Sequence, residues 1–241
     1  MNLIVDVGNT RVKFAVFNKN KLVYKTNFNL SDFKSEYKNL KKTYATLKNA
    51  ITSSVGKLSK EDVDILKQDL RVLELNSETK VPFRNNYKTP TTLGVDRVAL
   101  VSASVLHHPN SNVLIIDAGT CVTYDFVTDK NVYLGGAISP GLRLRYKSLN
   151  NLTANLPLLE TKVPKKITGN STDASIHSGV VIGLVKEIDG VIEEYSAKYS
   201  DLTVILTGGD TKMLSKQLKS SIFANSDFLL EGLNYILEFN S

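Results

Sequence analysis

Residues 3–17 read LIVDVGNTRVKFAVF, and residues 113–127 read VLIIDAGTCVTYDFV. In each stretch an apolar run ends in an aspartate, a short turn with glycine and threonine follows, and a second β-rich run returns. This order is typical of a β-hairpin that starts from a buried strand. Because Asp6 and Asp117 open the two turns 111 positions apart, the chain is predicted to contain two halves of similar architecture.

Each hairpin is followed by a third strand pattern and by helical patterns, which predicts an α/β fold with two lobes, residues 1–110 and 111–241. The charge differs between the halves: the first carries 18 Lys/Arg and 10 Asp/Glu, the second 12 and 14. A basic half can attract an anion. Its lysines are scattered and not interleaved with aromatic residues, so a solvated surface is the favoured interpretation and no nucleic-acid partner is expected.

Helical periodicity is expected over 59–70, 93–106, 173–198, 211–220 and 228–239. Ser31 is expected to cap a helix that runs to about residue 40. The apolar stripe of the 173–198 helix, which includes Ile176, Leu184 and Ile188, belongs either to the core or to a dimer contact.

The composition excludes several classes of protein. With 241 residues, 42% hydrophobic and 22% charged, the chain has an ordinary globular composition. One cysteine, Cys121, excludes a disulfide framework and suits a reducing compartment; it is expected to be a small core residue. With only three histidines, the chain has few residues from which a histidine metal site could be built. Neither a membrane-spanning apolar run nor a signal-peptide pattern is found, so no membrane association and a cytoplasmic location are expected.

The two turns have a composition suited to phosphate. An aspartate at the end of a buried strand is costly without a partner, and glycine lets the backbone approach a ligand closely. Backbone N–H groups with a threonine hydroxyl form an anion-binding concavity, and the carboxylate can hold a hydrated cation. The alternative is a pair of plain hairpin turns. The usual mononucleotide and dinucleotide glycine motifs are absent.

Further motifs follow in a recognisable order: Tyr87 through Pro90, Gly94-Val95-Asp96-Arg97, Gly135 through Gly141, Gly169-Asn170-Ser171-Thr172 and Gly208-Gly209-Asp210. With the two turns, they cover nearly the whole chain and resemble type III pantothenate kinase, in the superfamily of actin, sugar kinases and heat-shock ATPases. The resemblance implies two actin-like (ribonuclease H-like) lobes. Each lobe would have a mixed five-stranded sheet flanked by helices, with a cleft between the lobes.

The resemblance also implies the reaction: ATP phosphorylates pantothenate to 4′-phosphopantothenate, the first step of coenzyme A synthesis, in a homodimer that uses Mg²⁺ and a monovalent cation (K⁺ or NH₄⁺). Asp96 would be the general base. Asp117 would bind the monovalent cation, and Asp6 would bind Mg²⁺, through water. ATP would contact Asp6, Val7, Gly8, Asn9, Thr10, Arg11, Val12, Lys13 and Thr120. Pantothenate would contact Tyr87, Gly94, Val95, Asp96, Arg97 and Thr172.

Two other functions stay open at this stage: a sugar kinase or polyphosphate enzyme on the same lobes, and a nucleotide-binding regulator without catalysis. The retained aspartates argue against the regulator, and the Gly94–Arg97 segment argues against another substrate. The small-residue run Gly135–Gly141 either lets a ligand lie close or forms a tight packing corner.

Overall fold

A computed structural model describes residues 1–8, 11–54 and 58–241. Contacts divide the chain into two units, Met1–Pro109 with Asp227–Ser241, and Asn110–Ser226. The division falls near residue 110, but the last helix, expected in a second lobe over 111–241, packs with the first unit.

The first unit is built on a mixed sheet with strand order β3-β2-β1-β4-β5. The hairpin strands β1, β2 and β3 are antiparallel, whereas β1, β4 and β5 run parallel. The elements of this unit are β1 (Asn2–Val7), β2 (Val12–Asn18), β3 (Lys21–Phe28), α1 (Phe33–Thr43), β4 (Asn49–Ser54), α2 (Lys60–Asp69), β5 (Arg71–Glu74), β6 (Arg84–Asn85), α3 (Val95–His107) and α8 (Phe228–Phe239).

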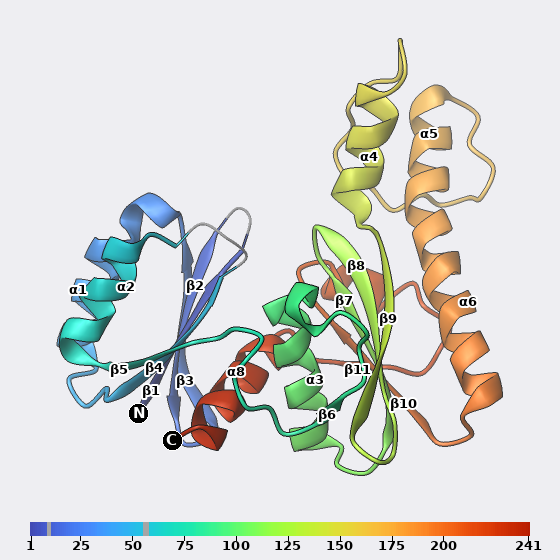
Figure 1. The fold of residues 1–241 in the computed structure, drawn as a ribbon. Helices are drawn as coiled ribbons and strands as arrows, with labels where there is room; N and C mark the ends of the chain where they lie inside the picture. Colours follow the sequence, from blue (N-terminus) through green and yellow to red (C-terminus); the bar gives the residue numbers. More distant parts are fainter. Residues whose placement is uncertain (9–10, 55–57) are drawn as a thin grey trace. The chain divides into compact units, whose positions relative to one another are not determined.

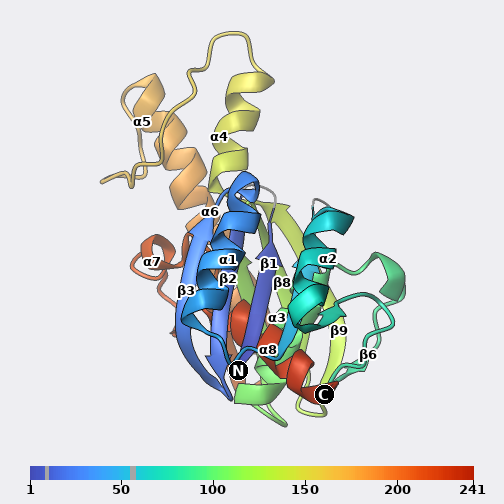
Figure 2. The same ribbon diagram turned by 90° about the vertical axis from the view of Figure 1, so that its left-hand side faces the viewer.

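Helices cover both faces of this sheet. Figures 1 and 2 show α1 and α2 together on one face, and Figure 1 shows α8 on the other. Alternation along β1 explains the arrangement, because side chains of a strand point to opposite faces in turn. Leu3, Val5 and Val7 join the core with α1 and α2, while Asn2 reaches α8 through a 2.9 Å hydrogen bond to Asn234.

The C-terminal helix packs closely on α3. A Cβ atom on Gly232 of α8 would lie closer than 3.0 Å to the backbone of Ala99, so only glycine allows this approach. Leu233 and Ile236 are fully buried on the same helix. The packing of α8 against the complementary surface of α3, and not its position in the sequence, therefore places this helix in the first unit.

The second unit repeats the arrangement, with its strands in the order β11-β10-β7-β8-β9. Strands β7, β8 and β9 are antiparallel, and β7, β10 and β11 are parallel. Its elements are β7 (Asn112–Ala118), β8 (Cys121–Val127), β9 (Val132–Pro140), α4 (Leu142–Asn151), α5 (Thr172–His177), α6 (Gly183–Lys198), β10 (Leu202–Thr207), α7 (Thr211–Leu214) and β11 (Phe223–Ala224). The predicted duplication and the two mixed sheets are thus confirmed, but the prediction of five strands in each is wrong for the second sheet, which has six in the order β11-β10-β7-β8-β9-β6.

The apolar stripe over 173–198 belongs to the core of this unit. Ile176, Leu184 and Ile188 are buried against Tyr124 and Phe126 of β8. The predicted single helix is interrupted, because residues Ser178–Ile182 form a π-helical turn between α5 and α6. The four-residue spacing of Ile176, Val180 and Leu184 also fits an uninterrupted α-helix, so the apolar pattern does not reveal the π-helical turn.

Two local predictions are wrong. A 3₁₀ turn over Leu30–Asp32 precedes α1, so Asp32 and not Ser31 is the N-cap. The Ser31 hydroxyl instead donates to the Asp32 carboxylate at 3.2 Å. The helix expected over 211–220 is only the short α7.

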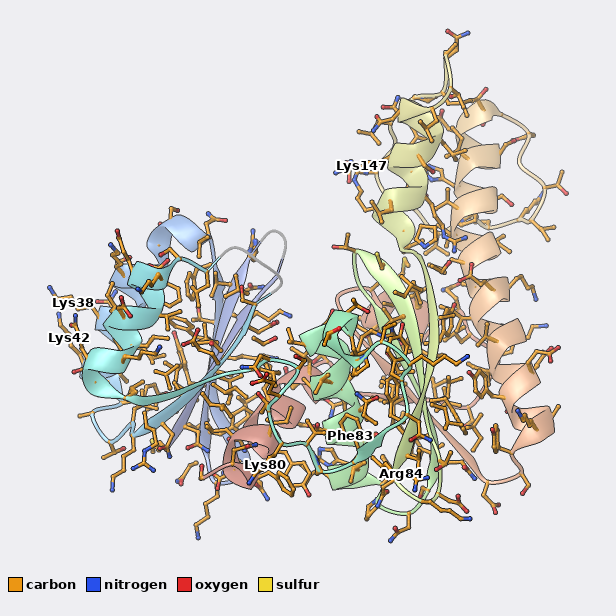
Figure 3. The ribbon with its side chains drawn as sticks, in the orientation of Figure 1. Lys38, Lys42, Lys80, Phe83, Arg84 and Lys147 are labelled. Carbon is orange, nitrogen blue, oxygen red and sulfur yellow. The ribbon has the colours of Figure 1, made fainter. Side chains whose placement is uncertain are left out.

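The lysines of α1 lie on its outer side. Lys38 and Lys42 are exposed, and Figure 3 shows both at the surface away from the sheet. This placement agrees with a solvated helix face. None of the helices within the described ranges is long and apolar enough to cross a membrane.

Candidate functional site

The first turn joins β1 to β2 and holds an ion pair. Asp6 lies opposite Lys13 in the antiparallel register, and the Lys13 Nζ is 3.2 Å from Asp6 Oδ2. The Gly8 N–H donates to the Arg11 carbonyl at 3.0 Å, which closes the turn. Asn9 and Thr10, both expected to contact ATP, lie outside the described residues.

The Asp6 carboxyl has an unusual electrostatic environment. Burial raises its pKa; the Lys13 ammonium opposes this effect, and the carboxylate of Asp96 adds to it. Asp6 and Asp96 are 90 positions apart, yet they act on each other within the first unit. The fold therefore brings together the predicted Mg²⁺ ligand and the predicted general base.

Asp96 is fixed at the start of α3. Its Oδ1 accepts a hydrogen bond from the backbone N–H of Arg97 at 2.8 Å. Gly94 is the N-cap, and a Cβ added there would lie 2.4 Å from Asp96 Oδ1. Gly94 therefore leaves the space that the Asp96 side chain occupies.

Arg97 and Tyr87 form a second pair in the same unit. The Arg97 guanidinium carbon lies over the Tyr87 ring, 5.6 Å from its centroid. Arg97 is buried, and a buried guanidinium stacked on a ring keeps its orientation. Because Arg97 follows Asp96 directly, Tyr87, Asp96 and Arg97 come from one neighbourhood of the first unit.

The second turn joins β7 to β8. Asp117 is half-buried opposite Thr123, and the Gly119 N–H donates to the Cys121 carbonyl at 2.9 Å. Thr120 is exposed at the tip of the turn, where its hydroxyl is available to a ligand. Cys121 is also exposed, so the expectation of a core cysteine is wrong. It lies where the strand leaves the turn, and the buried residues begin only at Val122.

The Gly208-Gly209-Asp210 segment lies directly against this second turn. Gly208 has a φ of +94°, and a Cβ there would lie 2.4 Å from both Asp117 Oδ1 and the Ala118 carbonyl oxygen. The Asp210 N–H donates to that same carbonyl at 3.0 Å, and burial raises the pKa of the Asp210 carboxyl. The parallel pairing of β7 with β10 explains this, since both strands end at the same edge of the sheet.

The small-residue run supports packing at two positions. A Cβ on Gly136 would overlap the Tyr124 carbonyl, and one on Gly141 would overlap the carbonyl oxygens of Gly119 and Thr120. Glycine at these positions lets strand β9 and the start of α4 approach the neighbouring backbone. Of the two interpretations, packing therefore has direct structural support.

Thr172 is the first residue of α5, and the Ser171 hydroxyl caps that helix by accepting the Ala174 N–H at 3.2 Å. Ser171, Asp173 and His177 line a cavity of about 740 Å³ together with lysines such as Lys165. Thr172 belongs to the second unit, whereas the other predicted substrate contacts belong to the first.

Two side-chain groups near these segments escaped the sequence reasoning. The Tyr146 hydroxyl is 2.7 Å from Nδ1 of His177. Arg145 of α4 forms an ion pair with Glu187 of α6. Neither pair has a sequence signal, because the partners are 31 and 42 positions apart and carry no motif.

The donors present fit the cations that the motifs predict. No group of three or more His, Cys, Asp or Glu side chains that could hold a metal is found over residues 1–8, 11–54 and 58–241. Mg²⁺ needs no such cage: it keeps several waters and uses one or two carboxylates with substrate phosphates. The carboxylate of Asp96 adds to the effect of burial in raising the pKa of Asp6, and a bound cation would oppose both effects. Asp117 Oδ1 and the Ala118 carbonyl oxygen both face the Gly208 turn, and such oxygens suit a monovalent cation.

A family model described as type III pantothenate kinase matches residues 2–194. The chain belongs to the type III pantothenate kinase family. A relative of that name from Christiangramia forsetii is 52% identical over 240 residues, covering 100% of this chain and 99% of the relative. Another, from Flavobacterium psychrophilum, is 48% identical, covering 99% of each. The predicted family and enzyme class, a kinase, are confirmed.

Solved structures share the fold at low identity. A Campylobacter jejuni protein named after the Baf family of transcriptional activators superposes with a TM-score of 0.65 at 21% identity, covering 99% of this chain and 98% of that one. A Listeria monocytogenes protein described as an N-acetylmannosamine kinase gives 0.56 at 12%, with the same two coverages. The predicted similarity of fold to the sugar kinases is confirmed.

Proposed function

We propose that this chain transfers the terminal phosphoryl group of ATP to the primary hydroxyl of pantothenate, giving 4′-phosphopantothenate in the first step of coenzyme A synthesis. Membership of the type III pantothenate kinase family supports the substrate. The observation that carries the chemistry is the pair Asp6 and Asp96, two carboxylates from distant motifs that act on each other in the first unit.

Asp96 accepts the proton of the pantothenate hydroxyl as that oxygen attacks the phosphorus. Its hydrogen bond from the Arg97 N–H holds the carboxylate in place. Phosphoryl transfer has a loose transition state, so positioning and charge neutralisation dominate. A general base adds a factor of about 10²–10⁴ in rate. The Arg97 guanidinium, oriented by Tyr87, binds the pantothenate carboxylate.

The two turns bind ATP. In the first, residues Asp6–Lys13 contact ATP, and the Lys13 ammonium attracts the phosphates. In the second, the exposed Thr120 hydroxyl makes a further contact. A bound Mg²⁺ supplies neutralisation of the phosphate charge. Asp6 is the residue that holds it, through water, and Asp117 is the ligand of K⁺ or NH₄⁺.

Three further features belong to the proposal. Thr172 contacts pantothenate at the start of α5, next to the basic cavity around Lys165. The enzyme acts as a homodimer, as the family resemblance implies. Its location is the cytoplasm, which agrees with a single, exposed and unpaired cysteine.

The experiment is a measurement of ATP consumption with and without pantothenate, with K⁺ exchanged for Na⁺. Turnover that depends on pantothenate and on K⁺ is expected, and turnover with sugars or inorganic polyphosphate instead would remove the assignment. Asp96→Asn should lose about 10²–10⁴ in turnover while ATP still binds. Asp129→Asn, the same change at an exposed turn position, is the matched control. Near-normal turnover in Asp96→Asn would eliminate the base role.

A further inference from the structure

The corner between β9 and α4, residues 139–142, packs directly against the second turn. The Gly141 N–H donates to the Thr120 carbonyl at 3.1 Å. A Cβ on Gly141 would lie 2.6 Å from that same carbonyl oxygen. Because the two backbones are in contact, a shift of the corner displaces the peptide of Thr120. Figure 1 shows α4 following directly from the end of β9 at this point.

Arg145 holds this corner from the first turn of α4. Its Nε donates to the Pro140 carbonyl at 2.8 Å, and a terminal nitrogen donates to the Ser139 hydroxyl at 3.0 Å. The same nitrogen pairs with the Glu187 carboxylate. A guanidinium can make these bonds together because its N–H donors are fixed in one plane.

Glu187 is in turn anchored to the core of the unit. The Tyr124 hydroxyl donates to Glu187 Oε1 at 2.8 Å, and the Tyr124 side chain is buried in β8. Burial alone would raise the pKa of Glu187, but hydrogen bonds from Arg145, Ser139 and Tyr124 outweigh it and lower the pKa. Glu187 therefore stays charged.

The ion pair is shielded from water. The Arg145 and Glu187 side chains are only 20% and 30% exposed. The bond network thus runs from β8 through α6 to α4, and it ends on the carbonyl and hydroxyl groups of the corner. A partly buried charged pair with several hydrogen bonds is harder to break than an exposed one.

We infer that Arg145 is a positioning residue for phosphoryl transfer, which fixes the second turn, and with it Thr120, through the corner at Pro140 and Gly141. This inference rests on the proposed function, in which Thr120 contacts ATP. Arg145 itself touches neither substrate in this scheme; it acts through the backbone that it holds.

The first test compares Arg145→Gln with Arg143→Gln. Arg143 lies on the same helix, but its guanidinium donates to the Leu159 carbonyl at 2.7 Å and pairs with Glu160 at 3.1 Å. Misplacing a contact by about 1 Å costs up to ~10²-fold. Arg145→Gln is therefore expected to lower kcat/KM for ATP by roughly 10-fold to 100-fold, with the KM for pantothenate changed less than about twofold. Arg143→Gln should leave both constants near the wild-type values.

Arg145→Lys tests whether the positive charge alone is enough, or whether the planar guanidinium with its several N–H donors is needed. Lysine restores the attraction to Glu187, but one ammonium cannot hold Pro140, Ser139 and Glu187 in the same geometry. The ATP defect should therefore persist in part. Full recovery with lysine, or an equal loss toward ATP and pantothenate in Arg145→Gln, would overturn the inference.

Amide hydrogen exchange gives a readout that does not need activity. In Arg145→Gln and Arg145→Lys, the Gly141 N–H should exchange faster, because its bond to Thr120 is loosened, while the core of β7 exchanges as in the wild type. Unchanged exchange at Gly141 would refute the positioning role. If the wild type lacks pantothenate-dependent turnover, the proposed function fails, yet the exchange result still decides whether Arg145 holds the turn. If Arg145→Gln does not fold, Arg145→Lys carries both measurements.

Discussion

Gly94→Ala should damage catalysis far more than stability. The new Cβ would lie 2.4 Å from Asp96 Oδ1, about 1 Å inside an ordinary contact of 3.4 Å. The backbone is not the obstacle, since Gly94 has φ −58° and ψ 134°, which alanine adopts readily. The Asp96 carboxylate must therefore move by roughly 1 Å, and a displacement of that size costs up to ~10²-fold in rate.

The loss of stability should be small. The clashing atom is the end of a side chain that can rotate away, and alanine is a poorer N-cap than glycine by less than about 1 kcal/mol. For a chain of this length, that lowers Tm by only about 2–4 °C. The assay is pantothenate-dependent turnover beside a thermal melt, with ATP affinity measured separately.

The control is Gly190→Ala in α6, where an added Cβ meets no atom within 4 Å. It should keep full activity and gain up to about 1 kcal/mol in helix stability. A double-mutant cycle gives the decisive comparison. If Gly94 acts through Asp96, then adding Gly94→Ala to Asp96→Asn should cause almost no further loss of turnover. Additive losses, or normal turnover in Gly94→Ala, would refute the reasoning.

Further outcomes follow from the two turns. Burial raises the pKa of Asp6, so the ligand-free protein loses stability as pH rises from 3.8, the ordinary value, through the pKa of the folded state. Asp6→Asn removes this titration. The variant should therefore have a higher Tm than the wild type at neutral pH and an equal Tm at low pH. Mg²⁺ with ATP should stabilise the wild type more than Asp6→Asn, and equal stabilisation would contradict the ligand role. Gly208→Ala, at φ +94° and against the Ala118 carbonyl, should cost more than about 1 kcal/mol in denaturant unfolding, whereas Gly209→Ala, which meets nothing within 4 Å, should not. Equal stability of the two glycine variants would show that the second turn can relax.

Much of the local structure follows from short-range patterns. The strand over Lys21–Phe28 and the helix over Phe228–Phe239 lie where the apolar periods predict them. The helix expected over 59–70 is α2, and Ser59 caps it by accepting the Asp62 N–H at 3.1 Å. The failure at Ser31 has a local cause too, since a 3₁₀ turn over Leu30–Asp32 moves the N-cap by one residue, to Asp32.

For the candidate site, too, the sequence predicts some features and the fold decides others. The motifs and the resemblance that they carry propose the site residues. They do not say that Asp96 acts on Asp6, that Gly94 leaves room for Asp96, or that Gly141 touches the Thr120 peptide. Each of these contacts brings together groups whose distance depends on how side chains pack in the folded chain. A short stretch of sequence does not show that packing.

By itself, then, the sequence determined the duplicated hairpins, the α/β class, the family and the identity of the chemical groups, since all of these depend on residue order within short segments. The tertiary structure alone decided that the C-terminal helix joins the first unit, that Arg145 and Glu187 support the second turn, and that Cys121 is exposed. The physical reason is that packing selects among surfaces from distant parts of the chain, and that selection depends on shape and burial, which residue order does not display.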